Sequence, residues 1–276
     1  MTAVAAPYQI RCAEIWGGAA VNEDQITTPG VRAAIHSTAS GDAKGGDLYY
    51  FSVCAYDTLT RIAIADVRGH GEGVSHLSEW LYGALEARMN DSNGAEVLTD
   101  LNDMVRARGF EAITTAVVAT FHRDKRLLYY SYAGHPPLML GRSGQPWQPL
   151  EAPKTSGPAN LPLGVIAGAR FSQEKVRVEP GDRLFLYTDG VAECPGPGEE
   201  LYGDDKMLAA LNHTSGRPLA EVARDIREDL MHYAGGTLDH DDCTFLLVEV
   251  LEQPPFWKRR IFPGRPLAQR AGKPNG

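Results

Sequence analysis

The sequence has few cysteines and no long apolar run. Its four cysteines, spread over 276 residues, form no Cys-x-x-Cys pair, so neither a zinc site nor a disulfide framework is predicted. No stretch reaches the roughly 18 consecutive apolar residues that a membrane span needs, and residues 1–11 lack the pattern of a signal peptide. We therefore expect a cytoplasmic protein with reduced thiols and no transmembrane segment.

Basic residues are also in the minority. Lys and Arg number 27 against 35 Asp and Glu, so the formal net charge is −8 and gives no electrostatic reason to expect nucleic acid as a partner. The hydrophobic share of 43% and the charged share of 22% are typical of a folded globular protein and exclude disordered, collagen-like and coiled-coil chains. The sequence does not indicate an oligomeric state.

Composition divides the chain into three parts. Residues 253–276 contain six basic and no acidic residues among several prolines and glycines, which leaves a formal charge of −14 on the rest. We expect a lead-in segment at 1–29, one domain at 30–252 and a flexible basic tail at 253–276. Docking of the tail onto an anionic surface is the alternative.

Strand and helix patterns alternate along the expected domain. Three strand pairs rich in β-branched and aromatic residues are predicted, at 47–56 with 62–66, 115–121 with 127–132, and 183–188 with 244–250. Apolar residues at helical spacing predict helices around 74–85, 97–105 and 219–233. Because the strands pair locally and helices come between the pairs, an antiparallel α+β layer fold is favoured over a parallel doubly wound sheet.

Aspartates stand at the ends of the predicted strands. If the first hairpin turns just after residue 56, Asp47 lies opposite Asp66. Asp189 closes one strand of the third pair, and Asp241 and Asp242 open its partner. Antiparallel pairing would then gather these carboxylates at one end of a sheet.

Carboxylates gathered in this way repel one another and raise one another's pKa unless a cation lies among them. Oxygen ligands without a His or Cys cluster favour Mg²⁺ or Mn²⁺ over Zn²⁺. The alternative for each single aspartate is that it only stabilises a turn. The convergence of four or five of them favours a metal site.

A glycine-rich turn follows Asp66. Residues 66–73 read Asp-Val-Arg-Gly-His-Gly-Glu-Gly and lead into a predicted helix, where backbone N–H groups can bind phosphate. Equally, the glycines can serve only to supply positive φ angles. The turn is neither a P-loop nor a dinucleotide fingerprint, and the chain has no Gly-x-Ser-x-Gly nucleophile elbow. His70 and His135 are candidate proton donors to a leaving alkoxide, with a structural role as the alternative for both.

Six short motifs occur in one order along the chain. They are Gly45-Gly46-Asp47, Asp66-Val67-Arg68-Gly69-His70-Gly71, Ala133-Gly134-His135-Pro136-Pro137, Leu161-Pro162-Leu163-Gly164, Tyr187-Thr188-Asp189-Gly190-Val191-Ala192-Glu193 and Asp241-Asp242-Cys243-Thr244. Together they resemble the metal-dependent protein phosphatases (PPM family), and within that family the bacterial stage II sporulation protein E-like serine phosphatases. The likeness covers roughly residues 30–251.

The resemblance implies a four-layer αββα sandwich, with two antiparallel β-sheets flanked by helices and two Mn²⁺ or Mg²⁺ ions at one end. Asp66 would bridge the ions and Val67 would offer its backbone carbonyl. Asp242 is the weaker candidate, because the family's ligand is usually the first residue of its motif. The implied metal ligands are Asp47, Asp66, Val67, Asp189 and Asp241, and the expected catalytic residues are Asp66 and His70.

The implied activity is hydrolysis of phosphoserine or phosphothreonine in proteins by a metal-activated water, in bacterial signalling of the partner-switching type. The implied substrate is a phosphorylated regulator of the anti-anti-sigma type. Two alternatives stay open. One is a catalytically weak phosphatase-like domain that acts as a phosphoprotein-binding regulator, and the other is a structural domain whose aspartates only make turns.

Two positions depart from the family pattern. Tyr50 stands where the family commonly has Asp, which leaves a weaker outer metal site in question. Arg68 stands where the family commonly has Ser before Gly-His-Gly. It is predicted either to contact phosphate or simply to be exposed.

Overall fold

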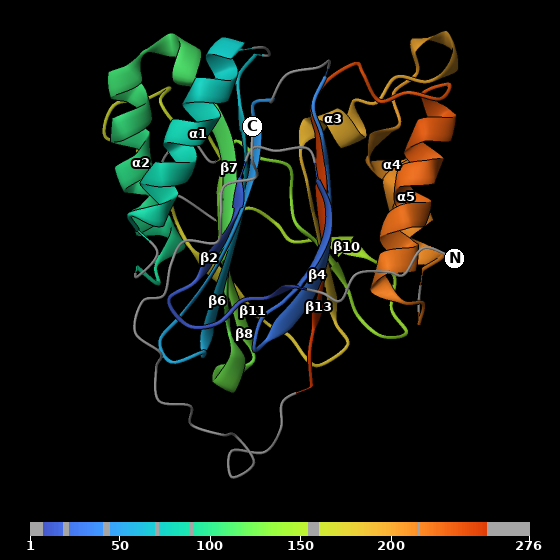
Figure 1. Ribbon diagram of the computed structural model, residues 1–276, viewed down its shortest axis with the longest axis horizontal. Coiled ribbons are helices and arrows are strands. Elements are labelled where there is room, and N and C mark those ends of the chain that lie inside the picture. The colour runs from blue at the N-terminus through green and yellow to red at the C-terminus, as the bar shows by residue number, and fades with distance from the viewer. Residues whose placement is uncertain are drawn as a thin grey trace.

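The computed structural model describes residues 8–18, 22–40, 45–69, 72–88, 91–153, 160–214 and 216–252. Within these ranges two β-sheets pack face to face, and a layer of helices covers the outer face of each (Figure 1). The predicted four-layer α+β sandwich is confirmed. The expected tail at 253–276 lies outside the described residues.

The larger sheet has seven strands in the described part of the chain. Its neighbours pair antiparallel, except that β1 runs parallel to β3. The expected pairing of the strand at 183–188 with that at 244–250 is confirmed. In spatial order the strands are β1 (Tyr8–Gln9), β3 (Asn22–Thr27), β4 (Val31–Thr38), β13 (Cys243–Val250), β12 (Arg183–Tyr187), β9 (Met139–Gly141) and β10 (Gln148–Pro149).

The smaller sheet contains both predicted hairpins. Ala55, Tyr56 and Asp57 have positive φ angles and form the tight turn of the first hairpin, where the sequence places it. All of the strand pairs given for this sheet are antiparallel. In spatial order its six described strands are β11 (Glu174–Arg177), β8 (Leu127–Ala133), β7 (Thr114–His122), β6 (Leu59–Val67), β5 (Asp47–Cys54) and β2 (Ile15–Gly18).

Helices α1 (Glu72–Glu86) and α2 (Gly94–Arg108) cover the smaller sheet, and α4 (Gly203–Asn212) and α5 (Leu219–Tyr233) cover the larger one (Figure 1). Each packs through an apolar stripe at helical spacing, as in α5, whose buried side chains recur every three or four residues. The short α3 (Asp189–Ala192) follows β12. Single helical turns lie at η1 (Phe110–Ala112), η2 (Arg123–Lys125) and η3 (Pro197–Glu199).

Strand alternation decides which residues face the space between the sheets. Along β6, Ile62 and Ile64 belong to the core between the sheets, whereas Ala63 and Ala65 face α1 and α2. Because side chains alternate with a period of two, Asp66 continues the series of Ile62 and Ile64. It therefore lies on the inner face, one residue before the end of β6, at the edge of the central core.

No helix in the described ranges is both long and apolar enough to cross a membrane. The cytoplasmic location stays a prediction. All four cysteines are unbonded, as expected, and only Cys12 is exposed.

Candidate active site

Asp47 and Asp66 are directly paired across β5 and β6. The hairpin register that the sequence predicts is thus confirmed. Asp47 precedes the inward-facing Tyr49 by two residues, so it lies on the same inner face as Asp66. The hairpin alone therefore places two carboxylates side by side at one end of the sandwich.

Two further carboxylates reach this end from the other sheet. Asp189 begins α3, two residues after the last residue of β12, and Asp241 lies two residues before β13, which pairs antiparallel with β12. A pocket of about 310 Å³ opens here and is lined by Asp66, Asp189 and Asp241. Its other lining residues are Arg68, Gly69, Ile113 and Thr115. The structure thus brings together three of the predicted site aspartates at one pocket.

Burial and mutual repulsion perturb these carboxyl groups. Burial, followed by the charges of Asp189 and Asp241, raises the pKa of Asp66 to about 8. The pKa of Asp189 is raised by burial and then by Asp241, and that of Asp47 is raised well above its usual range by burial and then by Asp66. The exposed Glu193 adds to the repulsion on Asp66 and Asp189. The predicted electrostatic conflict is therefore present.

Thr188 holds Asp47 in place. Its hydroxyl donates a 2.7 Å hydrogen bond to Oδ2 of Asp47 and accepts a 3.1 Å bond from the backbone N–H of Thr244. Both threonines are buried. Sequence reasoning did not assign Thr188 a role, although it stands directly before Asp189 in one of the six motifs.

Asp242 has a different environment from Asp241. Its carboxylate accepts hydrogen bonds from the backbone N–H groups of Ser40, at 2.7 Å, and Gly46, at 2.5 Å. A Cβ atom added to Gly45 would clash with this carboxylate, so the chain before β5 needs glycine there. The hydrogen bonds of Asp242 are thus made to the segment that leads into Asp47, whereas Asp241 lines the pocket.

The remaining predicted residues are placed as follows. A Cβ atom added to Gly46 would clash with the carbonyl oxygen of Val67, so that carbonyl lies beside the residue that precedes Asp47. His70 lies outside the described residues. Tyr50 is fully buried on the helix side of β5, with its ring 5.9 Å from that of Tyr82, and does not line the pocket.

His135 is buried behind the pocket wall. Its Nδ1 shares a 3.0 Å hydrogen bond with the hydroxyl of Thr115, which lines the pocket. Burial lowers the pKa of His135 to about 3. The imidazole is therefore neutral at physiological pH, which favours the structural role over proton donation.

The donor chemistry of the pocket fits a hard cation. Its described lining offers three carboxylates and no nitrogen or sulfur ligand from His or Cys, and a cation would relieve the repulsion that raises the pKa of Asp66. In the described ranges, however, no group of three or more His, Cys, Asp or Glu side chains forms a ready-made metal cage.

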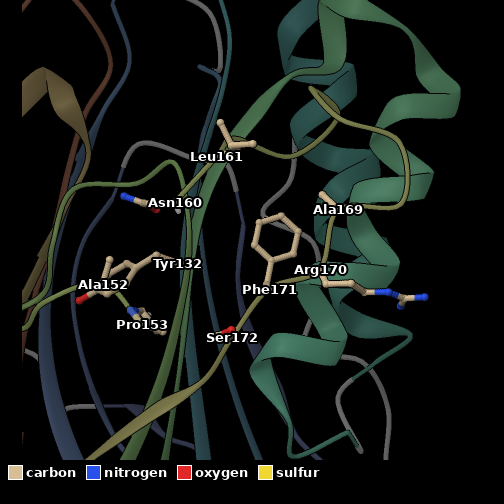
Figure 2. A pocket seen from close by; sticks show the side chains of 9 residues that line it. All are labelled: Tyr132, Ala152, Pro153, Asn160, Leu161, Ala169, Arg170, Phe171 and Ser172. Atoms are coloured by element: carbon tan, nitrogen blue, oxygen red, sulfur yellow. The ribbon is translucent and has the colours of Figure 1, made fainter. Parts of the chain in front are cut away.

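A second hollow lies between β8 and the segment 160–172 (Figure 2). Its volume of about 20 Å³ is enough for about one water molecule. Tyr132 and Phe171 line it, and the guanidinium of Arg170 points away from it (Figure 2). It is too small for a phosphorylated side chain.

Comparison with known proteins identifies the family. The model of the family described as Stage II sporulation protein E matches residues 56–251, which include Asp66, Asp189 and Asp241. The chain belongs to this family. Asp47 lies before the matched stretch, so its assignment depends on its pairing with Asp66.

This member of the stage II sporulation protein E family is similar to two curated proteins. It is 27% identical to the phosphoserine phosphatase RsbU of Bacillus subtilis over 206 residues, which cover 74% of this chain and 58% of RsbU. It is 26% identical to protein IcfG of Synechocystis sp. over 175 residues, which cover 58% of this chain and 26% of IcfG. The chain thus spans less than two thirds of either relative.

A solved structure shares the fold of this chain. The RsbU and RsbW domains of a Mycobacterium tuberculosis protein superpose with a TM-score of 0.69 at 24% identity. The superposition covers 83% of this chain and 62% of that one. This likeness supports the sandwich architecture described above.

Proposed function

We propose that this chain is a metal-dependent protein phosphatase that hydrolyses phosphoserine or phosphothreonine. The observation that carries the proposal is the pocket lined by Asp66, Asp189 and Asp241, whose crowded carboxylates are suited to divalent cations. Membership of the stage II sporulation protein E family and similarity to RsbU, named a phosphoserine phosphatase, support the reaction type.

Two Mn²⁺ or Mg²⁺ ions are the proposed cofactors. When bound, such ions supply a nucleophilic hydroxide from water and neutralise the charge that develops on the phosphate. The residues that would hold them are Asp47, Asp66, Val67, Asp189 and Asp241, with Val67 contributing its backbone carbonyl.

The chain's own residues orient this donor set. The hydroxyl of Thr188 donates a hydrogen bond that orients the carboxylate of Asp47. The carboxylate of Asp242 accepts a hydrogen bond from the backbone N–H of Gly46, the residue directly before Asp47. Asp66 lies at the pocket as the partner of Asp47 in the hairpin, and its carboxylate would hold the ions. His70 is the proposed proton donor to the departing serine or threonine alkoxide.

The proposed substrate is a phosphorylated bacterial regulator of the anti-anti-sigma type, dephosphorylated in the cytoplasm. Similarity to RsbU, named a phosphoserine phosphatase, supports a phosphoserine substrate, and the choice of regulator follows from the motif resemblance. The alternative, a phosphoprotein-binding regulator with weak catalysis, makes a different prediction. It would bind phosphoprotein without Mn²⁺ and release no phosphate.

Release of inorganic phosphate from a panel of serine-phosphorylated proteins, with and without Mn²⁺, tests the proposal. Asp66→Asn removes one charge with little change of shape and should abolish release. Asp205→Asn is the matched control, because Asp205 is exposed on α4, away from the pocket, and should keep full activity. Full Mn²⁺-dependent release by Asp66→Asn would refute the assignment.

A further inference from the structure

We infer that Arg68, whose guanidinium lies over the ring of Phe110, binds the phosphate group of the substrate; the inference rests on the proposed function. Arg68 lines the same pocket as Asp66, Asp189 and Asp241. Its Cζ atom lies 4.5 Å from the centroid of the Phe110 ring. Both side chains are exposed, and Phe110 retains 67% of its accessible surface.

The position of Arg68 is fixed by the segment between α2 and β7. The backbone N–H of Arg68 donates a 2.9 Å hydrogen bond to the carbonyl of Ile113, three residues after Phe110. Ile113 itself lines the pocket. The backbone and the side chain of Arg68 therefore both contact one short segment, which consists of η1 and Ile113. These contacts hold Arg68 at the pocket.

A negatively charged substrate needs a basic side chain at this acidic pocket. Its described lining carries three acidic side chains and a single basic one, Arg68. A phosphate monoester carries up to two negative charges at neutral pH, so it is repelled by the carboxylates wherever they are not neutralised. Arg68 supplies an attractive charge at the same pocket.

Within the described ranges, the guanidinium of Arg68 has no acidic partner. Among the described residues its guanidinium makes no ion pair with any carboxylate, although three line the same pocket. The contact with Phe110 is a cation–π contact and takes up none of the forked N–H donors of the guanidinium as hydrogen bonds. Such a fork can bind two phosphate oxygens at once, which a lysine ammonium does not do.

The test compares two arginines whose guanidinium groups lie over an aromatic ring. Arg108 has its Cζ atom 4.2 Å from the ring centroid of Trp80 and is exposed, but does not line the pocket. The variants are Arg68→Ala, Arg68→Lys and the control Arg108→Ala. Each is measured for KM and kcat on a phosphoserine peptide, for calorimetric binding of inorganic phosphate with Mg²⁺ present, and for Mg²⁺ affinity.

Loss of a charge-assisted hydrogen-bonding group should raise the KM and the phosphate Kd of Arg68→Ala by roughly 10-fold or more. Arg68→Lys should fall between this variant and the wild type, because it keeps the charge and loses the fork. Arg108→Ala should match the wild type, and the Mg²⁺ affinity of all three should be unchanged.

The inference is overturned if Arg68→Ala behaves like Arg108→Ala while the wild type releases phosphate, a result that leaves the proposed function standing. It is also overturned if Arg68→Ala loses Mg²⁺ affinity, or if the wild type binds no phosphate. If the wild type hydrolyses nothing but binds inorganic phosphate through Arg68, the proposed function fails and the phosphate site remains.

Discussion

Asp241 and Asp242 are neighbours in the sequence but face different surroundings. Asp241 lines the pocket, whereas Asp242 is buried and accepts hydrogen bonds from the backbone N–H groups of Ser40 and Gly46. This difference supports the proposal that Asp241 binds an ion, whereas Asp242 holds the chain that leads into Asp47.

The two assignments predict opposite effects of the same substitution. Asp242→Asn replaces one acceptor oxygen by a donor and should destabilise the fold by roughly 1–3 kcal/mol, because it leaves a buried N–H without a partner. Asp241→Asn removes repulsion and should leave the metal-free fold at least as stable, while abolishing stabilisation by Mn²⁺. Chemical denaturation in EDTA and in Mn²⁺ measures both effects. Equal behaviour of the two variants would contradict the assignment.

The raised pKa of Asp66 predicts how metal-free stability depends on pH. Its pKa rises from an ordinary 3.8 to about 8 on folding, so between these values the unfolded chain ionises before the folded one does. Below about pH 4, Asp66 is protonated in both states and its contribution to the free energy of unfolding is fully present. This contribution is lost as the pH rises through about 8.

In EDTA, the wild type should therefore lose stability relative to Asp66→Asn between pH 5 and pH 8. Added Mn²⁺ should reverse the loss most strongly at the higher pH, because ligands must be deprotonated to bind it. Thermal melts of both proteins across this range check the expectation. A constant difference in melting temperature would contradict it.

Thr188 provides a test of how Asp47 is oriented. Thr188→Val keeps the shape but removes the hydroxyl that donates to Asp47 and accepts from Thr244. Loss of a hydrogen bond to a metal ligand typically lowers metal affinity about 10- to 100-fold, and we expect a decrease in that range. Thr188→Ser keeps the hydroxyl and is the control. Calorimetric Mn²⁺ titration compares them, and equal affinities would show that the bond does not orient Asp47.

Substitution by alanine should have opposite effects on stability at two of the glycines. A Cβ atom on Gly190 would clash with the backbone oxygen of Asp242, so Gly190→Ala should separate α3 from β13 and cost roughly 1–3 kcal/mol. A Cβ atom on Gly83, exposed within α1, would meet nothing within 4 Å. Gly83→Ala should stabilise the protein by roughly 0.5–1 kcal/mol. Denaturant midpoints report both, and destabilisation by Gly83→Ala would contradict this packing.

The sequence predicts the hairpin at the site because its register depends on local turn chemistry. With the turn at residues 55–58, pairing of Asp47 with Asp66 follows from strand geometry. The apolar stripes of α1, α2 and α5 are likewise local and were predicted. Short or polar elements were not, such as β3 (Asn22–Thr27), whose largely polar residues form a strand by pairing with β4.

The contacts that organise the site could not be predicted, because they join distant segments. Thr188 and Asp47 are 141 residues apart, and Asp242 and Gly46 are 196 apart. Spacing within a motif carries no information about such partners. The neutral state of His135 likewise depends on burial, which the Gly-His-Pro-Pro segment does not reveal.

The central claim is that divalent cations bind among these carboxylates. Anomalous diffraction at the manganese edge, from crystals soaked in Mn²⁺, tests it most directly. We expect two peaks in the pocket, with oxygens of Asp66, Asp189 and Asp241 within about 2.0–2.3 Å of an ion, and none in crystals of Asp66→Asn. A pocket without manganese in the wild type would contradict the account.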